Sequence, residues 1–166
     1  MIKSILTLIT IATLSIVSAH AKTLKVPNDE FAVASVAIPS EWEIDKDVNN
    51  GVGATSEDGA VYLSIVAVGS EKGMNAEIES TFDMLKEHGV SLDEKSKKEN
   101  KFKLNGLDAE EMIFQGKDED GPAAVSICFV PVNNKLLVVT YWVSTDKEEA
   151  HQAEVGKIVS SIKPVS

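Results

Sequence analysis

The side chains best able to do chemistry in this sequence are a single cysteine, Cys128, and two histidines beyond the N-terminal segment, His88 and His151. A reactive cysteine needs a neighbouring base or a helix N-terminus to lower the pKa of its thiol. Cys128 stands in an apolar run that predicts a strand, with no histidine nearby in the sequence. We therefore interpret Cys128 as an inert, buried thiol, because free cysteine is among the most buried residue types.

The two histidines are better explained by structure than by catalysis. His88 precedes Gly89 at the expected end of a helix, where a cation suits the helix dipole. His151 falls four residues before Val155, on the apolar side of a second expected helix, which favours a partly buried packing role. Neither histidine forms a zinc-type spacing with the cysteine, so the sequence predicts no metal site of that kind.

An acidic run at residues 118–120, followed by Gly121, invites a calcium interpretation. With Gly121 at position 6 of an EF-hand loop, Gly116 and Ile127 would occupy the first and last positions, where carboxylates are required. The EF-hand interpretation therefore fails. A solvated turn is favoured for this segment, and a weak surface ion site stays open as the alternative.

Signatures of the common catalytic families are absent from the sequence. There is no G-x-S-x-G elbow, Walker loop or dinucleotide-binding fingerprint. Carboxylate pairs of the glycosidase type stay open, since acids are plentiful and sequence does not set their distances in the fold. We predict a protein that is not an enzyme, with no catalytic residue, no cofactor and no metal ion.

Lysines gather between residues 95 and 103, in a chain that is acidic overall. The 166 residues carry a formal net charge of −10, and all 16 basic side chains are lysine. The favoured interpretation of the cluster is protection of an edge strand, because lysines there discourage pairing between sheets. The alternative is a basic stripe that docks an acidic partner, with Lys97, Lys98 and Lys101 as the predicted partner-binding residues. The acidic balance excludes a nucleic-acid binder, since phosphate contacts need a positive field.

Residues 1–21 have the pattern of a secretory signal peptide. Lys3 supplies the positive start, a mostly apolar run follows, and Ala19-His20-Ala21 has the A-x-A form of a cleavage site. The apolar run is about 14 residues long, short of the roughly 20 needed to cross a bilayer. We predict a periplasmic or secreted protein without a membrane span, with one mature domain over residues 22–166. Cleavage removes one lysine and no acid, which moves the net charge from −10 to −11.

The mature sequence predicts strands and two helices. Strands are expected at residues 31–38, 52–56, 60–68, 107–115, 123–132 and 135–143. The first helix is expected to start at Asn75, and the second to open with a capping box from Thr145 to Glu148. Strands 123–132 and 135–143 are apolar on both faces, so they are predicted to be central. The order predicts an α+β domain with a central antiparallel sheet of about six strands and helices packed on it.

The two ends of the mature sequence resemble the PsbP-like (Mog1p/PsbP-like) fold family. Val36 to Trp42 (VAIPSEW) is similar to the family's opening of strand, proline, short turn and tryptophan. Tyr141 to Ser144 (YWVS) and Ile158 to Lys163 (IVSSIK) are similar to its closing strand and helix. The resemblance covers roughly residues 31–163, lacks the lipid-acceptor cysteine of the lipoprotein members, and carries over no functional residue.

The resemblance implies an α/β/α sandwich, in a family whose members mostly bind partners. These include photosystem extrinsic subunits, a Ran-binding import factor, chaperones for secreted effectors and periplasmic proteins. The leading hypothesis is an exported, non-catalytic domain that acts by protein–protein contact. The alternative is a small-ligand or lipid-binding module, or an unrecognised hydrolase, that uses a cleft between sheet and helix. A deep apolar pocket converging on carboxylates would favour the alternative, and an exposed apolar patch would favour a protein partner.

Overall fold

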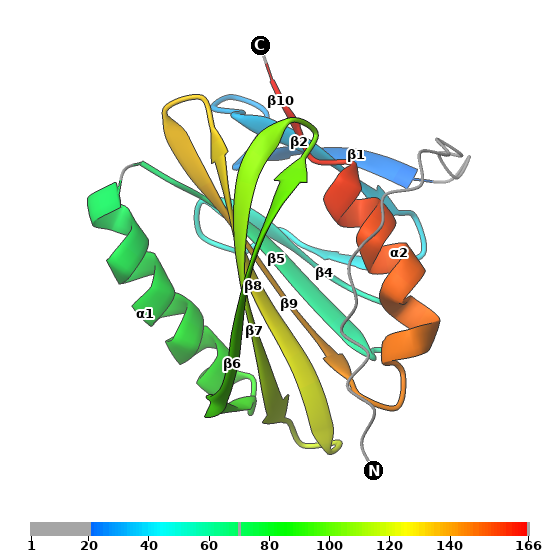
Figure 1. Cartoon of the computed structure of the whole chain (residues 1–166). Helices are drawn as coiled ribbons and strands as arrows, with labels where there is room; N and C mark the ends of the chain where they lie inside the picture. Colours follow the sequence, from blue (N-terminus) through cyan, green and yellow to red (C-terminus); the bar gives the residue numbers. More distant parts are fainter. Residues whose placement is uncertain (1–20, 70, 166) are drawn as a thin grey trace.

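The computed structural model describes residues 21–69 and 71–165 (Figure 1). A seven-stranded antiparallel sheet, in the order β3-β4-β5-β9-β8-β7-β6, organises this part of the chain. Its strands are β3 (Glu43–Asp45), β4 (Gly51–Thr55), β5 (Val61–Val68), β6 (Ser91–Leu104), β7 (Leu107–Lys117), β8 (Pro122–Val132) and β9 (Lys135–Ser144). A smaller sheet joins β1 (Ala21–Val26), β2 (Ala34–Pro39) and β10 (Lys163–Pro164) in the order β1-β2-β10. The two helices are α1 (Glu71–Glu87) and α2 (Glu148–Ser160).

Short turns connect the strands from β6 to β9, so each of them pairs with the next along the chain. Asn105 and Asn133 occupy left-handed positions in two of these turns, with φ of 50° and 54°. Asparagine tolerates this conformation better than most residues do. The turn between β4 and β5 contains Gly59 at φ 73°, as the Asp-Gly signal at that point predicts.

The two faces of the large sheet support two separate hydrophobic cores. On one face, Leu85 of α1 packs in a cluster with Phe114 and Ile127. On the other face, Ile158 of α2 shares a cluster with Val139 and with residues of the smaller sheet. Figure 1 shows α1 and α2 on opposite sides of the sheet. Because full burial of one large apolar side chain stabilises a fold by about 1.5–3 kcal/mol, both helices are held mainly by these contacts.

The structure confirms the predicted α+β class with its large antiparallel sheet. Strands β8 and β9 lie inside that sheet and are buried from both faces, as their two apolar faces predict. The expected number of about six strands is too low, because the described residues form seven strands in one sheet and three in another. The face that carries α2 is therefore covered by strands as well as by a helix.

Both predicted helix starts are wrong. Helix α1 begins at Glu71, so Asn75 lies inside it; asparagine costs only about 0.7 kcal/mol within a helix and does not force a start. At α2 the cap position is Lys147, without a side-chain hydrogen bond to the helix. The Lys147 amide already donates to the Ser144 carbonyl in a turn from β9, which places Thr145 too early to cap.

The predicted signal peptide covers residues 1–21. Residues 1–20 lie outside the described part of the chain, and Ala21 is the first described residue, in β1. Among the described residues, neither helix has the length and apolar character that a membrane crossing requires.

Candidate functional site

A groove of about 520 Å³ lies between α2 and the neighbouring face of strands β6 to β9. The dimensions of the elements explain why this space is open. Neighbouring strands are about 5 Å apart, so a seven-stranded sheet is far wider than a single helix of roughly 10 Å diameter. Helix α2 packs against β9 and β2, and the smaller sheet covers β4 and β5. One face of β6, β7 and β8 therefore stays uncovered beside α2 and forms the floor of the groove. We call this space the α2 groove.

The helix side of the α2 groove is polar near the start of α2, at Glu148, His151 and Gln152, and apolar farther along the helix. Val155, Gly156 and Val159 line it from α2. A Cβ atom added at Gly156 would meet no other heavy atom within 4 Å, so the space in front of this glycine is open. Phe102 of β6 and Val143 of β9 add apolar surface on the sheet side.

The floor of the α2 groove carries a buried polar pair. Glu111 of β7 is only 9% exposed, and Ser126 of β8 is 2% exposed. The Ser126 hydroxyl donates a hydrogen bond to Glu111 Oε1 over 2.5 Å. Buried carboxylates usually face a cation or several N–H groups. Among the described residues, the hydrogen-bond partner of Glu111 is instead this one hydroxyl group.

Two further groups on the floor are held in their protonated forms. Cys128 lies directly opposite Glu111 in the β7–β8 register, and Tyr141 lies opposite Ser126 in the β8–β9 register. Burial, and then the negative charge of Glu111, raise the pKa of the Cys128 thiol to about 12. The same two causes raise the pKa of Tyr141. The predicted burial of Cys128 is confirmed, and its low reactivity stays a prediction.

His151 connects α2 to the turn between β4 and β5 at one end of the groove. Its Nε2 lies 3.0 Å from Asp58 Oδ2, and its Nδ1 lies 3.2 Å from Glu154 Oε2. Burial alone would lower the pKa of His151, but the hydrogen bonds with Asp58 and Glu154 outweigh it and leave the pKa raised. His151, followed by Ser56, lowers the pKa of Asp58 to about 2. The predicted packing histidine is thus partly buried and bonded to two carboxylates.

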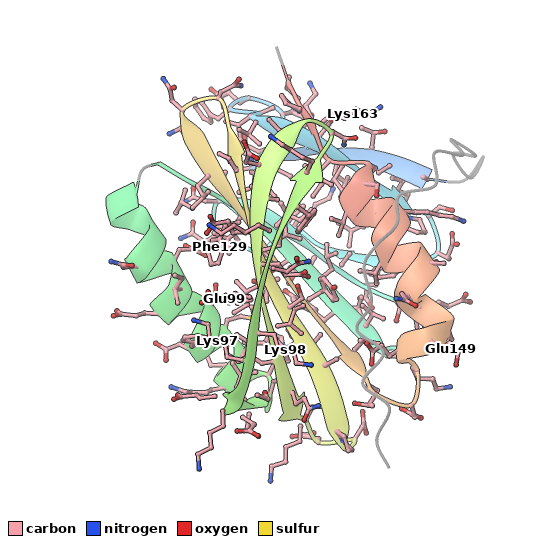
Figure 2. The ribbon with its side chains drawn as sticks, viewed as in Figure 1. Lys97, Lys98, Glu99, Phe129, Glu149 and Lys163 are labelled. Atoms are coloured by element: carbon pink, nitrogen blue, oxygen red, sulfur yellow. The ribbon has the colours of Figure 1, made fainter. Side chains whose placement is uncertain are left out.

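The three predicted partner-binding lysines do not form one stripe. They lie on β6, an edge strand of the large sheet, as the edge-protection interpretation expects. Figure 2 labels Lys97 and Lys98 on this strand. Lys98 alternates into the same side of β6 as Phe102 and lines the α2 groove. Lys101 alternates to the other side and pairs with Glu110 over 2.5 Å, directly across the strand pair. Lys97 pairs with Glu99 on β6 over 2.8 Å.

In the acidic turn at residues 118–121, the first carboxylate accepts hydrogen bonds from backbone amides of the same turn. Asp118 Oδ1 accepts hydrogen bonds from the amides of Asp120 and Gly121, and the Asp118 amide donates to the Gly121 carbonyl. This is the hydrogen-bonded turn that the sequence favours. Within residues 21–69 and 71–165, no three His, Cys, Asp or Glu side chains are grouped as metal ligands.

Sequence reasoning missed both the buried Glu111 and an aromatic group on the α1 side of the sheet. Tyr62 stacks on Trp142 with ring centroids 4.5 Å apart, and the His88 ring lies 5.4 Å from Trp142. His88 follows the last residue of α1 and is exposed. Tyr62 and His88 border a smaller cavity of about 250 Å³. The signal for Glu111 was present, because it stands between Ala109 and Ile113 on one face of a strand.

Solved structures of other proteins share the fold of this chain. Neither a protein-family model nor a curated protein matches the sequence. The solution structure of cyanobacterial PsbP (CyanoP) from Synechocystis sp. PCC 6803 superposes with a TM-score of 0.60 at 10% identity, over 93% of this chain and 98% of that one. The crystal structure of LpqN, involved in cell envelope biogenesis of Mycobacterium tuberculosis, superposes with a TM-score of 0.52 at 14% identity, over 89% and 92% of the two chains. The chain therefore has the PsbP-like fold that its opening and closing segments predict.

Proposed function

We propose that this chain is a non-catalytic binding domain that takes a small, largely apolar ligand in the α2 groove. The observation that carries the proposal is the open volume of about 520 Å³ between α2 and β6 to β9. Ligand sites are typically clefts of roughly 300–1,000 Å³ with apolar walls and a few polar groups that fix orientation. The α2 groove has this composition, with Phe102, Val155 and Val159 among its walls and Glu111 and Ser126 on its floor.

The groups around the groove that could act in catalysis are engaged in ways that favour binding. Nucleophilic catalysis needs a hydroxyl or thiol bonded to a base that activates it. The Ser126 hydroxyl does donate to the Glu111 carboxylate, but Ser126 is only 2% exposed, and the thiol of Cys128 has its pKa raised to about 12. Both ring nitrogens of His151 face carboxylates, so this ring is occupied with holding α2 in place.

Export to the periplasm or the outside of the cell is part of the proposal. The signal-peptide pattern of residues 1–21 supports it. Cleavage after Ala21 would leave all of β1 except that residue. LpqN, which shares the fold, is involved in cell envelope biogenesis in its own organism. N-terminal sequencing of exported protein should give Lys22 first, and a start at Met1 would contradict export with cleavage.

Blocking the groove from the helix side tests the binding function. The neutral apolar fluorophore N-phenyl-1-naphthylamine should bind the purified protein saturably. Gly156→Phe should lower its affinity by at least about tenfold, because the new ring enters the open space in front of this glycine. Ala153→Phe is the matched control, since Ala153 is exposed on the same helix outside the groove lining. Absence of saturable binding, or equal affinity in both variants, would contradict the proposal.

Protein–protein contact through β6 is a second candidate, favoured by one observation. Strand β6 has 14 residues and lies at the edge of the sheet, with Lys97, Lys98 and Lys101 along it. Edge strands offer backbone groups that a partner strand can pair with. The double variant Lys97→Glu with Lys101→Glu should reduce capture of an acidic partner. Undiminished capture would remove the lysines from the proposed contact.

A further inference from the structure

We propose that the α2 groove selects apolar molecules that carry one ammonium group, with Glu111 as the acceptor for that group. The inference rests on the proposed binding function and specifies its ligand class. Glu111 projects from the middle of β7 into a groove whose walls are mostly apolar. An apolar body would contact these walls while its charged end reaches the floor.

Burial leaves the Glu111 carboxylate with few polar contacts. A carboxylate that is nine-tenths buried loses most of its hydration, and a single hydroxyl replaces little of it. The Ser126 hydroxyl is its hydrogen-bond partner among the described residues, and no lysine in that part of the chain lies within 4.0 Å of it. A ligand ammonium group would supply the missing cation and its N–H donors at once.

The nearby lysines are placed so that they do not supply that cation. In the β6–β7 register Asn100 lies directly opposite Glu111, and Lys98 lies opposite Ile113. Lys98, Lys101 and Lys103 also line the groove. Lys101 and Lys103 are paired with Glu110 and Asp108, and Lys98 forms no ion pair with Glu111 within 4.0 Å. The residue of β6 directly opposite Glu111 is therefore a neutral amide, and the lysines on either side of it are not paired with this carboxylate.

Charge complementarity then decides between ligand classes. An anionic amphiphile such as a fatty acid would bring a second negative charge toward Glu111, in a protein with a net charge of −10. A neutral alcohol would only donate one hydrogen bond to the carboxylate. An ammonium group gains a charge-assisted hydrogen bond in a partly dehydrated site, which is roughly twice as strong as a neutral one.

Three ligands with the same eight-carbon chain test this selectivity: octylamine, 1-octanol and octanoate. Isothermal titration calorimetry at pH 7 should give octylamine an affinity at least about tenfold above that of octanol, with octanoate the weakest. Gly156→Phe should remove binding of all three, which separates the groove from nonspecific attraction of an amine to an acidic surface.

Glu111→Gln should lower the affinity for octylamine by about tenfold and leave that for octanol within about twofold. The matched control is Glu149→Gln, which removes the same charge from an exposed position on α2 (Figure 2) and should leave all three affinities unchanged. If Glu111→Gln does not fold, the order of the three ligands on the unaltered protein still decides.

The possible results separate this inference from the proposed function. Equal binding of octanol and octylamine, tighter binding of octanoate, or full amine selectivity in Glu111→Gln overturns the ammonium assignment and leaves the groove as an apolar site. Failure of all three ligands and of the neutral fluorophore overturns both. Binding of the ligands and of the fluorophore that is undiminished in Gly156→Phe also overturns both, because it lies outside the groove.

Discussion

His151 Nε2 and Asp58 Oδ2, 93 residues apart in the sequence, lie 3.0 Å from one another and tie the first turns of α2 to the β4–β5 turn. Ser56 holds the aspartate from the other side, with its hydroxyl donating to Asp58 Oδ1 over 2.8 Å. The contact sets the position of α2 over the sheet at the end of the groove, so its charge state bears on both stability and the shape of the site.

The stabilisation from this pair depends on pH in a defined window. The raised pKa of His151 means that its contribution is complete below the ordinary value of 6.5 and is lost as the pH rises through the folded pKa. The pKa of Asp58, lowered to about 2 from 3.8, means that its contribution is present above 3.8 and is lost as the pH falls toward 2. The pair is therefore fully effective between about pH 4 and pH 6.5.

Asp58→Asn should accordingly destabilise the protein at pH 5.5 and have little effect at pH 9. Because the Asp58 side chain is 45% exposed, solvent screens the pair and the loss should be only about 0.5–1 kcal/mol. Urea denaturation at the two pH values measures the difference. Asp146→Asn, an exposed acid just before α2, is the control without pH dependence. An equal loss from Asp58→Asn at both pH values would contradict the charged pair.

Gly156→Ala should stabilise the protein by about 0.5–1 kcal/mol, because glycine within a helix is less favourable than alanine by this amount. The added methyl group enters open space at the α2 groove and meets no neighbour within 4 Å. Ala153→Gly on the exposed side of the same helix should lower the stability by a similar amount. Urea midpoints for both variants test the pair of changes, and a destabilising Gly156→Ala would mean that the groove is filled at this point.

The strands that the sequence predicts are those with a strong pattern. Two apolar faces mark β8 and β9 as central, and the Asp-Gly signal places the β4–β5 turn. The strands that it misses are β3 with three residues and β10 with two, which are too short to show a period, and β1, where three of six residues are exposed. Such strands form because neighbours provide hydrogen bonds, and that information is long-range.

The candidate site depends on where α2 packs on the large sheet, and the local sequence pattern does not contain that information. Glu111 on a face with Ala109 and Ile113 was readable as a charge among apolar residues. That this face lies beside α2 rather than under it depends on how the helix packs across the sheet. The alternative of one basic stripe fails by simple strand alternation, because Lys98 and Lys101 are three residues apart on β6 and lie on opposite sides of it, whereas the favoured edge position of these lysines agrees with the strand order.

Cys128 should be almost unreactive toward a thiol reagent in the folded protein. With a pKa of about 12, its thiolate fraction at pH 8 is roughly a thousandfold below that of an ordinary cysteine, and burial restricts access further. Absorbance with Ellman's reagent should show negligible labelling in buffer and one equivalent in guanidinium chloride. Rapid labelling of the folded protein would mean that the floor of the groove is open to solvent at Cys128.

The hydrogen bond between Ser126 and Glu111 should behave as a coupled pair. Ser126→Ala removes the donor and leaves a buried carboxylate without it, so the free energy of unfolding should fall by about 1–3 kcal/mol. Replacing both partners, as Ser126→Ala with Glu111→Leu, removes the buried carboxylate together with its donor and should cost less than the two single changes together. Urea denaturation of the four proteins gives the coupling energy. Additive losses would show that the carboxylate does not depend on Ser126, and that other groups solvate it within the groove.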